Sequence, residues 1–131
     1  MLSSAEGTKR GSVLNQATLA ELKSLAQLGE PNPLVELIDL FLADTPNCLQ
    51  GMKTAAQEGR TSELRRLAHS LRGSSGNLGA ERLSAFCHEL ELASKNQMNS
   101  ATGEILESIA REFEDVKIAL AKERASCGPK A

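Results

Sequence analysis

His69 is the residue of this chain whose type and setting are best suited to chemistry. It lies within residues 64–80, where apolar side chains recur at helical spacing and form one stripe. At roughly 100° per residue, His69 points about 150° away from the mean direction of that stripe, so we expect it to face solvent or a partner. Arg65, Arg66 and Arg72 lie three or four positions away on the same side. A neutral imidazole carries a nitrogen lone pair, so the pattern predicts an exposed nucleophile in a cationic setting.

Two glycines follow the histidine at helical spacings. Gly76 fits a helix end, but the apolar period continues past Gly73 to Leu78, which places Gly73 inside the helix. A glycine inside a helix costs about 1 kcal/mol relative to alanine, so it needs a reason. The missing side chain leaves room for another molecule to come close to the imidazole. We therefore predict a docking surface around His69.

The segment around His69 also resembles a known family. Residues 68–91, which read AHSLRGSSGNLGAERLSAFCHELE, are similar to the signature of the histidine-containing phosphotransfer (HPt) domain, the helical carrier of multistep two-component phosphorelays. In that family the histidine is followed by a basic residue at the third position and glycine at the fourth. Small residues, Leu-Gly and an acidic or amide residue on the next helix complete the signature.

The resemblance implies roles for four residues. His69 would carry a phosphoryl group between aspartates of response-regulator receiver domains, and Gly73 matches the glycine of the signature. Arg72 would approach the phosphoryl group, although the family more often has lysine there, which changes the geometry of phosphate binding. Glu91 would accept a hydrogen bond from Nδ1 of the histidine and so leave Nε2 as the attacking atom.

The resemblance also implies the partners of such a carrier. These are response-regulator receiver domains and, as a possible donor, a hybrid sensor histidine kinase. We expect no cofactor on this chain, because Mg²⁺ is needed only by the partner receiver domain. We expect a monomer. We also expect no autokinase activity, since the sequence has no Gly-x-x-x-x-Gly-Lys-Ser/Thr motif and no glycine-rich loop between a strand and a helix.

Length and composition agree with a small helical protein. A chain of 131 residues suits one domain. Only 2% of the residues are aromatic, and this composition favours helices over sheets. With a net charge of −2, the chain as a whole has no positive electrostatic field that would attract nucleic acid. No apolar run is long enough to insert into a membrane, and no signal peptide is recognisable. Three widely spaced cysteines argue against a disulfide framework or a zinc site and favour the cytoplasm.

Apolar periodicity predicts an all-α fold, an antiparallel four-helix bundle with a short additional N-terminal helix. The short helix would be capped by Asn15 and cover about 16–28. The second would run from Leu34 up to Gly59, with a kink or a restart at Pro46. Thr61 or Ser62 would cap the third, and Gly76 or Gly79 would close it. The fourth helix would cover about 80–96 and the fifth about 102–124. We predict flexible tails over 1–13 and 126–131 around a domain spanning 14–125.

Several neighbouring residues have weaker claims. Arg65 and Arg66 either steer an acidic partner or belong to a solvated face. Ser74 is expected to shape the surface and Ser75 to point inward. His88 lies opposite the apolar stripe of its helix, without a basic or glycine neighbourhood on that helix, so we interpret it as a plain exposed residue. Cys48 and Cys87 lie on apolar stripes and are expected in the core.

Two other functions are weighed against the carrier. A helical interaction module would bind receiver domains without accepting phosphate, but the histidine and its surroundings are intact. A metal-dependent helical hydrolase would need carboxylates and histidines at paired spacings on two facing helices, and the sequence has none. A free-standing carrier and a domain from the end of a larger sensor kinase both fit the chain.

Overall fold

The structure is a computed structural model that describes residues 13–25, 33–95 and 100–126. These form five helices, α2 (Gln16–Leu25), α3 (Pro33–Gln57), α4 (Thr61–Asn77), α5 (Glu81–Lys95) and α6 (Ser100–Ser126), and no strand lies within the described ranges. Residues 1–12 and 127–131 of the two predicted tails lie outside the described residues. So does the predicted end of the first helix near residue 28.

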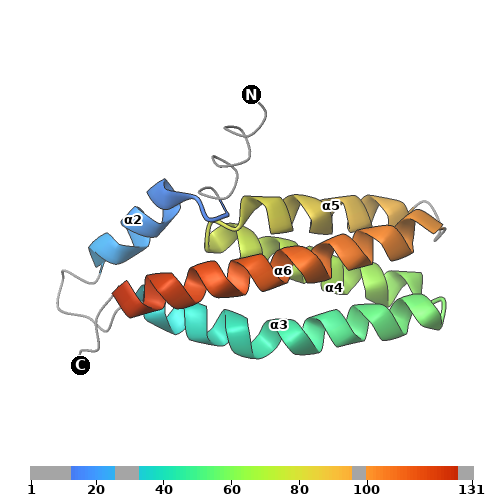
Figure 1. Ribbon diagram of the computed structural model, residues 1–131. Coiled ribbons are helices and arrows are strands. Elements are labelled where there is room, and N and C mark those ends of the chain that lie inside the picture. Colours follow the sequence, from blue (N-terminus) through green and yellow to red (C-terminus); the bar gives the residue numbers. More distant parts are fainter. Residues whose placement is uncertain (1–12, 26–32, 96–99, 127–131) are drawn as a thin grey trace.

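Helices α3 to α6 form an antiparallel bundle in which each helix packs against two neighbours (Figure 1). Helix α4 packs between α3 and α5, and α6 closes the ring between α5 and α3. The short helix α2 packs on α3 at one end of the bundle. The predicted four-helix bundle with an additional N-terminal helix is confirmed. Because α4 and α5 are joined by a short turn, side chains from both reach the same outer face.

The apolar stripes meet inside the bundle as the periodicity predicts. Fully buried leucine, isoleucine and valine side chains from all four long helices form the centre, and burying each contributes roughly 1.5–3 kcal/mol. These side chains are Leu34, Ile38, Leu64, Leu83, Leu90, Ile109, Val116 and Leu120. Cys87 is buried and Cys48 half-buried, as expected of core residues. Burial raises the pKa of the Cys87 thiol to about 12, so this thiol is inert.

Helix α3 continues through Pro46 without a restart. The proline lies inside the helix Pro33–Gln57, which curves along its length in Figure 1. The residues on both sides keep one buried face, with Phe41 and Thr45 before the proline and Met52 after it. Packing of this continuous face offsets the one backbone hydrogen bond that proline removes. Of the two alternatives predicted at Pro46, a kink or a restart, the restart with Thr45 as its cap is therefore wrong.

The turn between α3 and α4 is made by Gly59. Its φ of 72° lies in the left-handed region, and the N–H of Arg60 donates to the carbonyl of Ala55 at 2.9 Å. Arg60 becomes the residue before α4 and makes no side-chain cap hydrogen bond. The prediction that Thr61 or Ser62 caps this helix is wrong, because the tight turn brings both residues into its first turn.

The turn between α4 and α5 is made by Gly79, the second of the two predicted closing residues. Its φ is 79°, and the N–H of Ala80 donates to the carbonyl of Ser75 at 2.9 Å. Asn15 packs directly on this turn, where its N–H donates to the carbonyl of Gly79 at 2.7 Å. A Cβ at position 79 would lie 3.0 Å from backbone atoms of Asn15. Only glycine therefore fits.

Asn15 caps α2, as predicted. Its Oδ1 accepts hydrogen bonds from the N–H groups of Ala17 at 2.9 Å and Thr18 at 3.1 Å. Its Nδ2 donates to Glu81 Oε2 at 2.6 Å. One asparagine thus joins the start of α2 to the turn that sets the relative position of α4 and α5.

Candidate functional site

His69 projects from the outer face of α4, as its position opposite the apolar stripe predicts. Its side chain is 65% exposed. The neighbours in sequence on the opposite side of the helix, Ala68 and Leu71, are buried in the bundle. The ring therefore stands on a rigid element with one side open to a partner.

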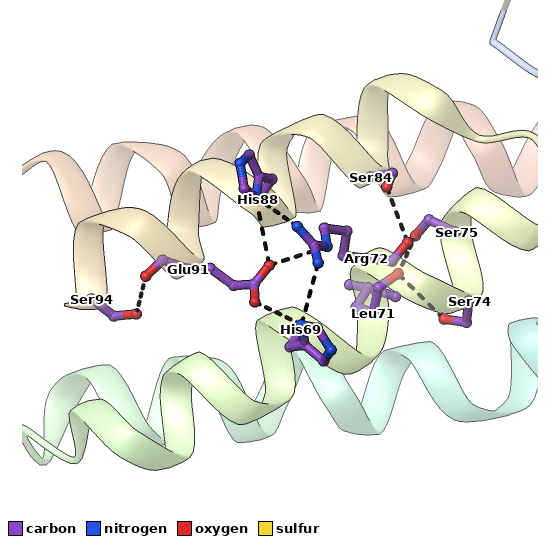
Figure 2. A network of polar contacts seen from close by, with 9 residues as sticks. All are labelled: His69, Leu71, Arg72, Ser74, Ser75, Ser84, His88, Glu91 and Ser94. Atoms are coloured by element: carbon purple, nitrogen blue, oxygen red, sulfur yellow. Dashed lines mark hydrogen bonds and ion pairs between the residues drawn. The ribbon is translucent and has the colours of Figure 1, made fainter.

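Glu91 reaches His69 from α5, as the resemblance implies. Its Oε2 lies 2.8 Å from Nδ1 of His69, and its side chain is only 15% exposed (Figure 2). An ionised carboxylate can only accept a hydrogen bond, so Nδ1 must carry the proton and donate it. In a neutral imidazole this leaves Nε2 with a free lone pair. Figure 2 shows that second ring nitrogen on the side away from Glu91.

Arg72 lies between the two helices and contacts three other polar side chains. Its Nε lies 3.2 Å from Glu91 Oε1, its Nη1 lies 2.7 Å from Nδ1 of His88, and its Nη2 lies 3.5 Å from Nδ1 of His69. Glu91 Oε1 is buried and has no hydrogen-bond partner of good geometry, so its contact with Arg72 is one of charge. The Arg72 guanidinium is thereby held beside the exposed imidazole.

His88 belongs to this cluster, so its interpretation as a plain exposed residue is wrong. Its ring is 51% exposed, yet Nδ1 contacts Arg72 Nη1 at 2.7 Å and lies 3.8 Å from Glu91 Oε1. The prediction considered only neighbours on its own helix, whereas Arg72 comes from α4. The spacing of His88 and Glu91, three positions apart on one helix face, is the sequence signal that could have found it.

Gly73 lies one turn after His69 on the exposed side of α4. A Cβ built at this position has nothing within 4 Å. Nothing in the chain therefore requires glycine at this position, and the open space is available to another molecule. The α4 backbone is fixed beside it, because Ser84 Oγ of α5 donates to the carbonyl of Arg72 at 3.0 Å.

The other two arginines of α4 are exposed. Arg66 donates from Nη2 and Nε to the carboxylate of Glu63, at 2.7 and 3.1 Å. These hydrogen bonds lower the pKa of the Glu63 carboxyl. Arg66 is thus engaged in a pair within its own helix, while Arg65 is exposed on the side of α4 that carries His69.

A shallow groove runs between α3 and α4 beside the histidine. Apolar side chains of α3 form one wall, with Leu37, Leu40 and Phe41 among them, and Ser70 and Ser74 line the α4 side. Leu40 is 59% exposed, so this wall of the groove offers apolar surface to solvent. Ser70, the residue that follows His69, is the lining residue of α4 nearest to it in the sequence.

Within 13–25, 33–95 and 100–126, no group of three or more histidine, cysteine, aspartate or glutamate side chains is placed to hold a metal ion. In those ranges no helix is both long enough and apolar enough to cross a bilayer.

Comparison with known proteins decides the family. The model of the Hpt domain family matches residues 36–122, which include every residue of the cluster around His69. The chain belongs to the Hpt domain family. The crystal structure of histidine-containing phosphotransfer protein B (HptB) from Pseudomonas aeruginosa PAO1 is similar to this Hpt domain, with a TM-score of 0.78 and 31% sequence identity. The match covers 87% of this chain and 96% of that chain. No curated protein sequence matches significantly.

The resemblance found in the sequence is therefore confirmed, and the molecule is a histidine phosphotransfer protein of phosphorelays. In this Hpt domain the cluster of His69, Arg72, His88 and Glu91 joins α4 to α5 on the outside of the bundle (Figure 2). Proteins of this family are phosphoryl carriers.

Proposed function

We propose that His69 carries the phosphoryl group, accepting it from the aspartyl phosphate of one receiver domain and donating it to the aspartate of another. The observation that supports this most is the 2.8 Å hydrogen bond between Nδ1 of His69 and Glu91, on a ring that is 65% exposed. It directs the free lone pair of a neutral imidazole outward. A nucleophile is then available without a separate general base.

The transfer is an in-line displacement at phosphorus. The Nε2 lone pair of His69 forms the N–P bond while the P–O bond to the donor aspartate breaks, and the electron pair leaves with the carboxylate. The ring becomes cationic, because Nδ1 keeps its proton, and Glu91 stabilises that charge. In the second half of the relay, the acceptor carboxylate attacks phosphorus and the N–P electron pair returns to Nε2. No proton has to move in either direction.

Arg72 supports the same reaction electrostatically. The Nη2 group of Arg72 lies 3.5 Å from Nδ1 of His69, so its positive charge lies beside the ring that would carry the phosphoryl group on Nε2. Arginine presents several donors in a fixed plane, which suits the oxygens of a phosphoryl group. Its positive charge compensates the negative charge that arrives with the phosphoryl group.

The partner is a receiver domain that docks over α4. Open space at Gly73 allows its backbone to approach, and the groove lined by Leu40 offers apolar contact beside the imidazole. The exposed Arg65 suits the acidic phosphorylation site of a receiver, which supplies the Mg²⁺ of the reaction. We propose that this chain acts as a monomer in the cytoplasm, needs no cofactor of its own and has no autokinase activity.

The test is transfer from a receiver domain that carries ³²P-phosphate on its aspartate. The wild-type protein is expected to take up label that is stable in alkali and labile in acid, whereas His69→Gln takes up none while its circular dichroism and melting temperature stay unchanged. The alternative, an interaction module without chemistry, predicts that the wild-type protein binds the receiver but takes up no label. Label that persists in folded His69→Gln would also overturn the proposal.

A further inference from the structure

We propose that His88 is a positioning residue of the phosphotransfer reaction, one that holds the guanidinium of Arg72 beside His69. The inference rests on the proposed role of His69 as the carrier. Its basis is the 2.7 Å contact between Nη1 of Arg72 and Nδ1 of His88, the shortest polar contact of the cluster. His88 itself does not reach the reacting atoms and acts through Arg72.

The protonation of both imidazoles follows from the groups they contact. Arginine has donors only, so Nδ1 of His88 must be an unprotonated acceptor and the ring must carry its proton on Nε2. His69 is in the opposite state, because its Nδ1 donates to Glu91 at 2.8 Å. Arg72 faces Nδ1 of both histidines, and only Nδ1 of His88 can therefore accept a hydrogen bond from it.

Two contacts fix the plane of the guanidinium. Nη1 is bound by His88 from one side, and Nε lies 3.2 Å from Glu91 Oε1. Nη2 is left directed at His69, where it lies 3.5 Å from Nδ1 without an acceptor to bind. The positive charge of Arg72 is then held beside the ring that carries the phosphoryl group. Without His88, only the contact with Glu91 would remain, and the guanidinium of a side chain that is 35% exposed could rotate away.

Three variants separate the acceptor from the shape of the side chain. His88→Leu removes the acceptor, and His88→Lys replaces it with a cation that repels Arg72. His88→Asn returns an acceptor oxygen close to the place of Nδ1. Glu89→Leu changes another exposed residue of α5 and serves as the matched control.

The measurement is the single-turnover rate of transfer from phosphorylated protein to a receiver domain. His88→Leu and His88→Lys are expected to slow transfer by roughly three- to tenfold, the effect of losing one charge-assisted hydrogen bond that orients the group. His88→Asn is expected to restore most of the rate, and Glu89→Leu to transfer like wild type. Equal melting temperatures would exclude unfolding as the cause.

A second measurement reads the protonation states directly. Long-range ¹H–¹⁵N spectra of the wild-type protein at pH 8 should place the imidazole proton of His88 on Nε2 and that of His69 on Nδ1. A proton on Nδ1 of His88, or folded His88→Leu that transfers as fast as wild type, overturns the inference. Wild-type protein that accepts no phosphoryl group would instead overturn the proposed function, so the two failures are distinguishable.

Discussion

In the proposed mechanism, the reactivity of His69 depends on Glu91 of the neighbouring helix, which lies 2.8 Å from Nδ1. Glu91 would hold the proton on Nδ1 and compensate the charge of the phosphorylated ring, and substitution can separate these two functions. Glu91→Gln keeps an acceptor for the Nδ1 proton but lacks the charge. Glu91→Leu lacks both.

We therefore predict that Glu91→Leu slows phosphoryl acceptance by roughly 10- to 100-fold, because a hydrogen bond to a charged group is lost. Glu91→Gln should retain a rate between that of Glu91→Leu and that of wild type. Single-turnover labelling by a phosphorylated receiver checks the order of the three rates. Equal rates for wild type and Glu91→Leu would show that Glu91 does not orient the ring.

Sequence alone predicted most of this cluster and missed one member. His69 and Arg72 lie on one helix, where spacing gives their relative position, and Glu91 followed from the resemblance to the family. His88 was missed because its partner, Arg72, reaches it from α4. Periodicity within one helix contains no information on contacts between two helices.

Among the elements, α4 combines helix stability with access for a partner. Gly73 is the point where the two requirements conflict. A Cβ at this position meets nothing within 4 Å, so alanine would fit the helix, but its methyl group would occupy the space proposed for a partner. Gly73→Ala is predicted to stabilise the protein by roughly 0.5–1 kcal/mol, from helix propensity and a less flexible unfolded chain. The same methyl group should slow transfer with a receiver domain.

Urea unfolding and transfer rates, measured on the same preparations, check that prediction. Gly103→Ala is the matched control, because a Cβ at this position of α6 also meets nothing within 4 Å. It should stabilise the helix without affecting transfer. If Gly73→Ala transfers as fast as wild type, the glycine does not serve the approach of a partner.

The turns before and after α4 differ in what surrounds their glycines. Gly59 and Gly79 have φ values of 72° and 79°, but only at Gly79 would a Cβ press on the backbone of Asn15, at 3.0 Å. Gly59→Ala should cost about 1–2 kcal/mol of unfolding free energy from backbone strain alone. Gly79→Ala should cost more. Urea unfolding that gave equal losses would show that the contact with Asn15 is absent or soft.

The helices themselves followed from apolar periodicity, whereas their ends did not. The stripe through α3 aligned correctly on both sides of Pro46, but propensity rules left a kink and a restart both open, and packing keeps the helix continuous. The predicted cap at Thr61 or Ser62 failed because the Gly59 turn takes up the residues before them. Local rules predict an element well and its boundary poorly when tertiary contacts decide the boundary.

At the scale of the whole molecule, ion pairs tie distant parts of the chain together. Arg124 of α6 donates to both carboxylate oxygens of Asp39 in α3, at 2.7 and 2.9 Å. Lys23 of α2 pairs with Glu123 of α6 at 3.0 Å. These contacts hold the end of the bundle near α2, away from the turn between α3 and α4.

The pair of Asp39 and Arg124 should make stability depend on pH. Hydrogen bonds from Arg124 hold the pKa of the Asp39 carboxyl below its ordinary value of 3.8. A carboxyl whose pKa is lower in the folded state stabilises the fold above its unfolded pKa and loses that contribution as pH falls through the folded pKa. Asp39→Asn should therefore lower the melting temperature at pH 7, with a difference that shrinks below pH 3.8. A difference independent of pH would contradict the ion pair as the cause.

In the proposed mechanism, the bundle presents the imidazole of His69 to a receiver domain. Locating the atom that receives the phosphoryl group tests this proposal most directly. Long-range ¹H–¹⁵N and ³¹P spectra of the phosphorylated protein locate the N–P bond. We predict that it forms at Nε2 of His69, with the Nδ1 proton retained against Glu91. Phosphate on Nδ1 of His69, or on any other residue, would contradict the account.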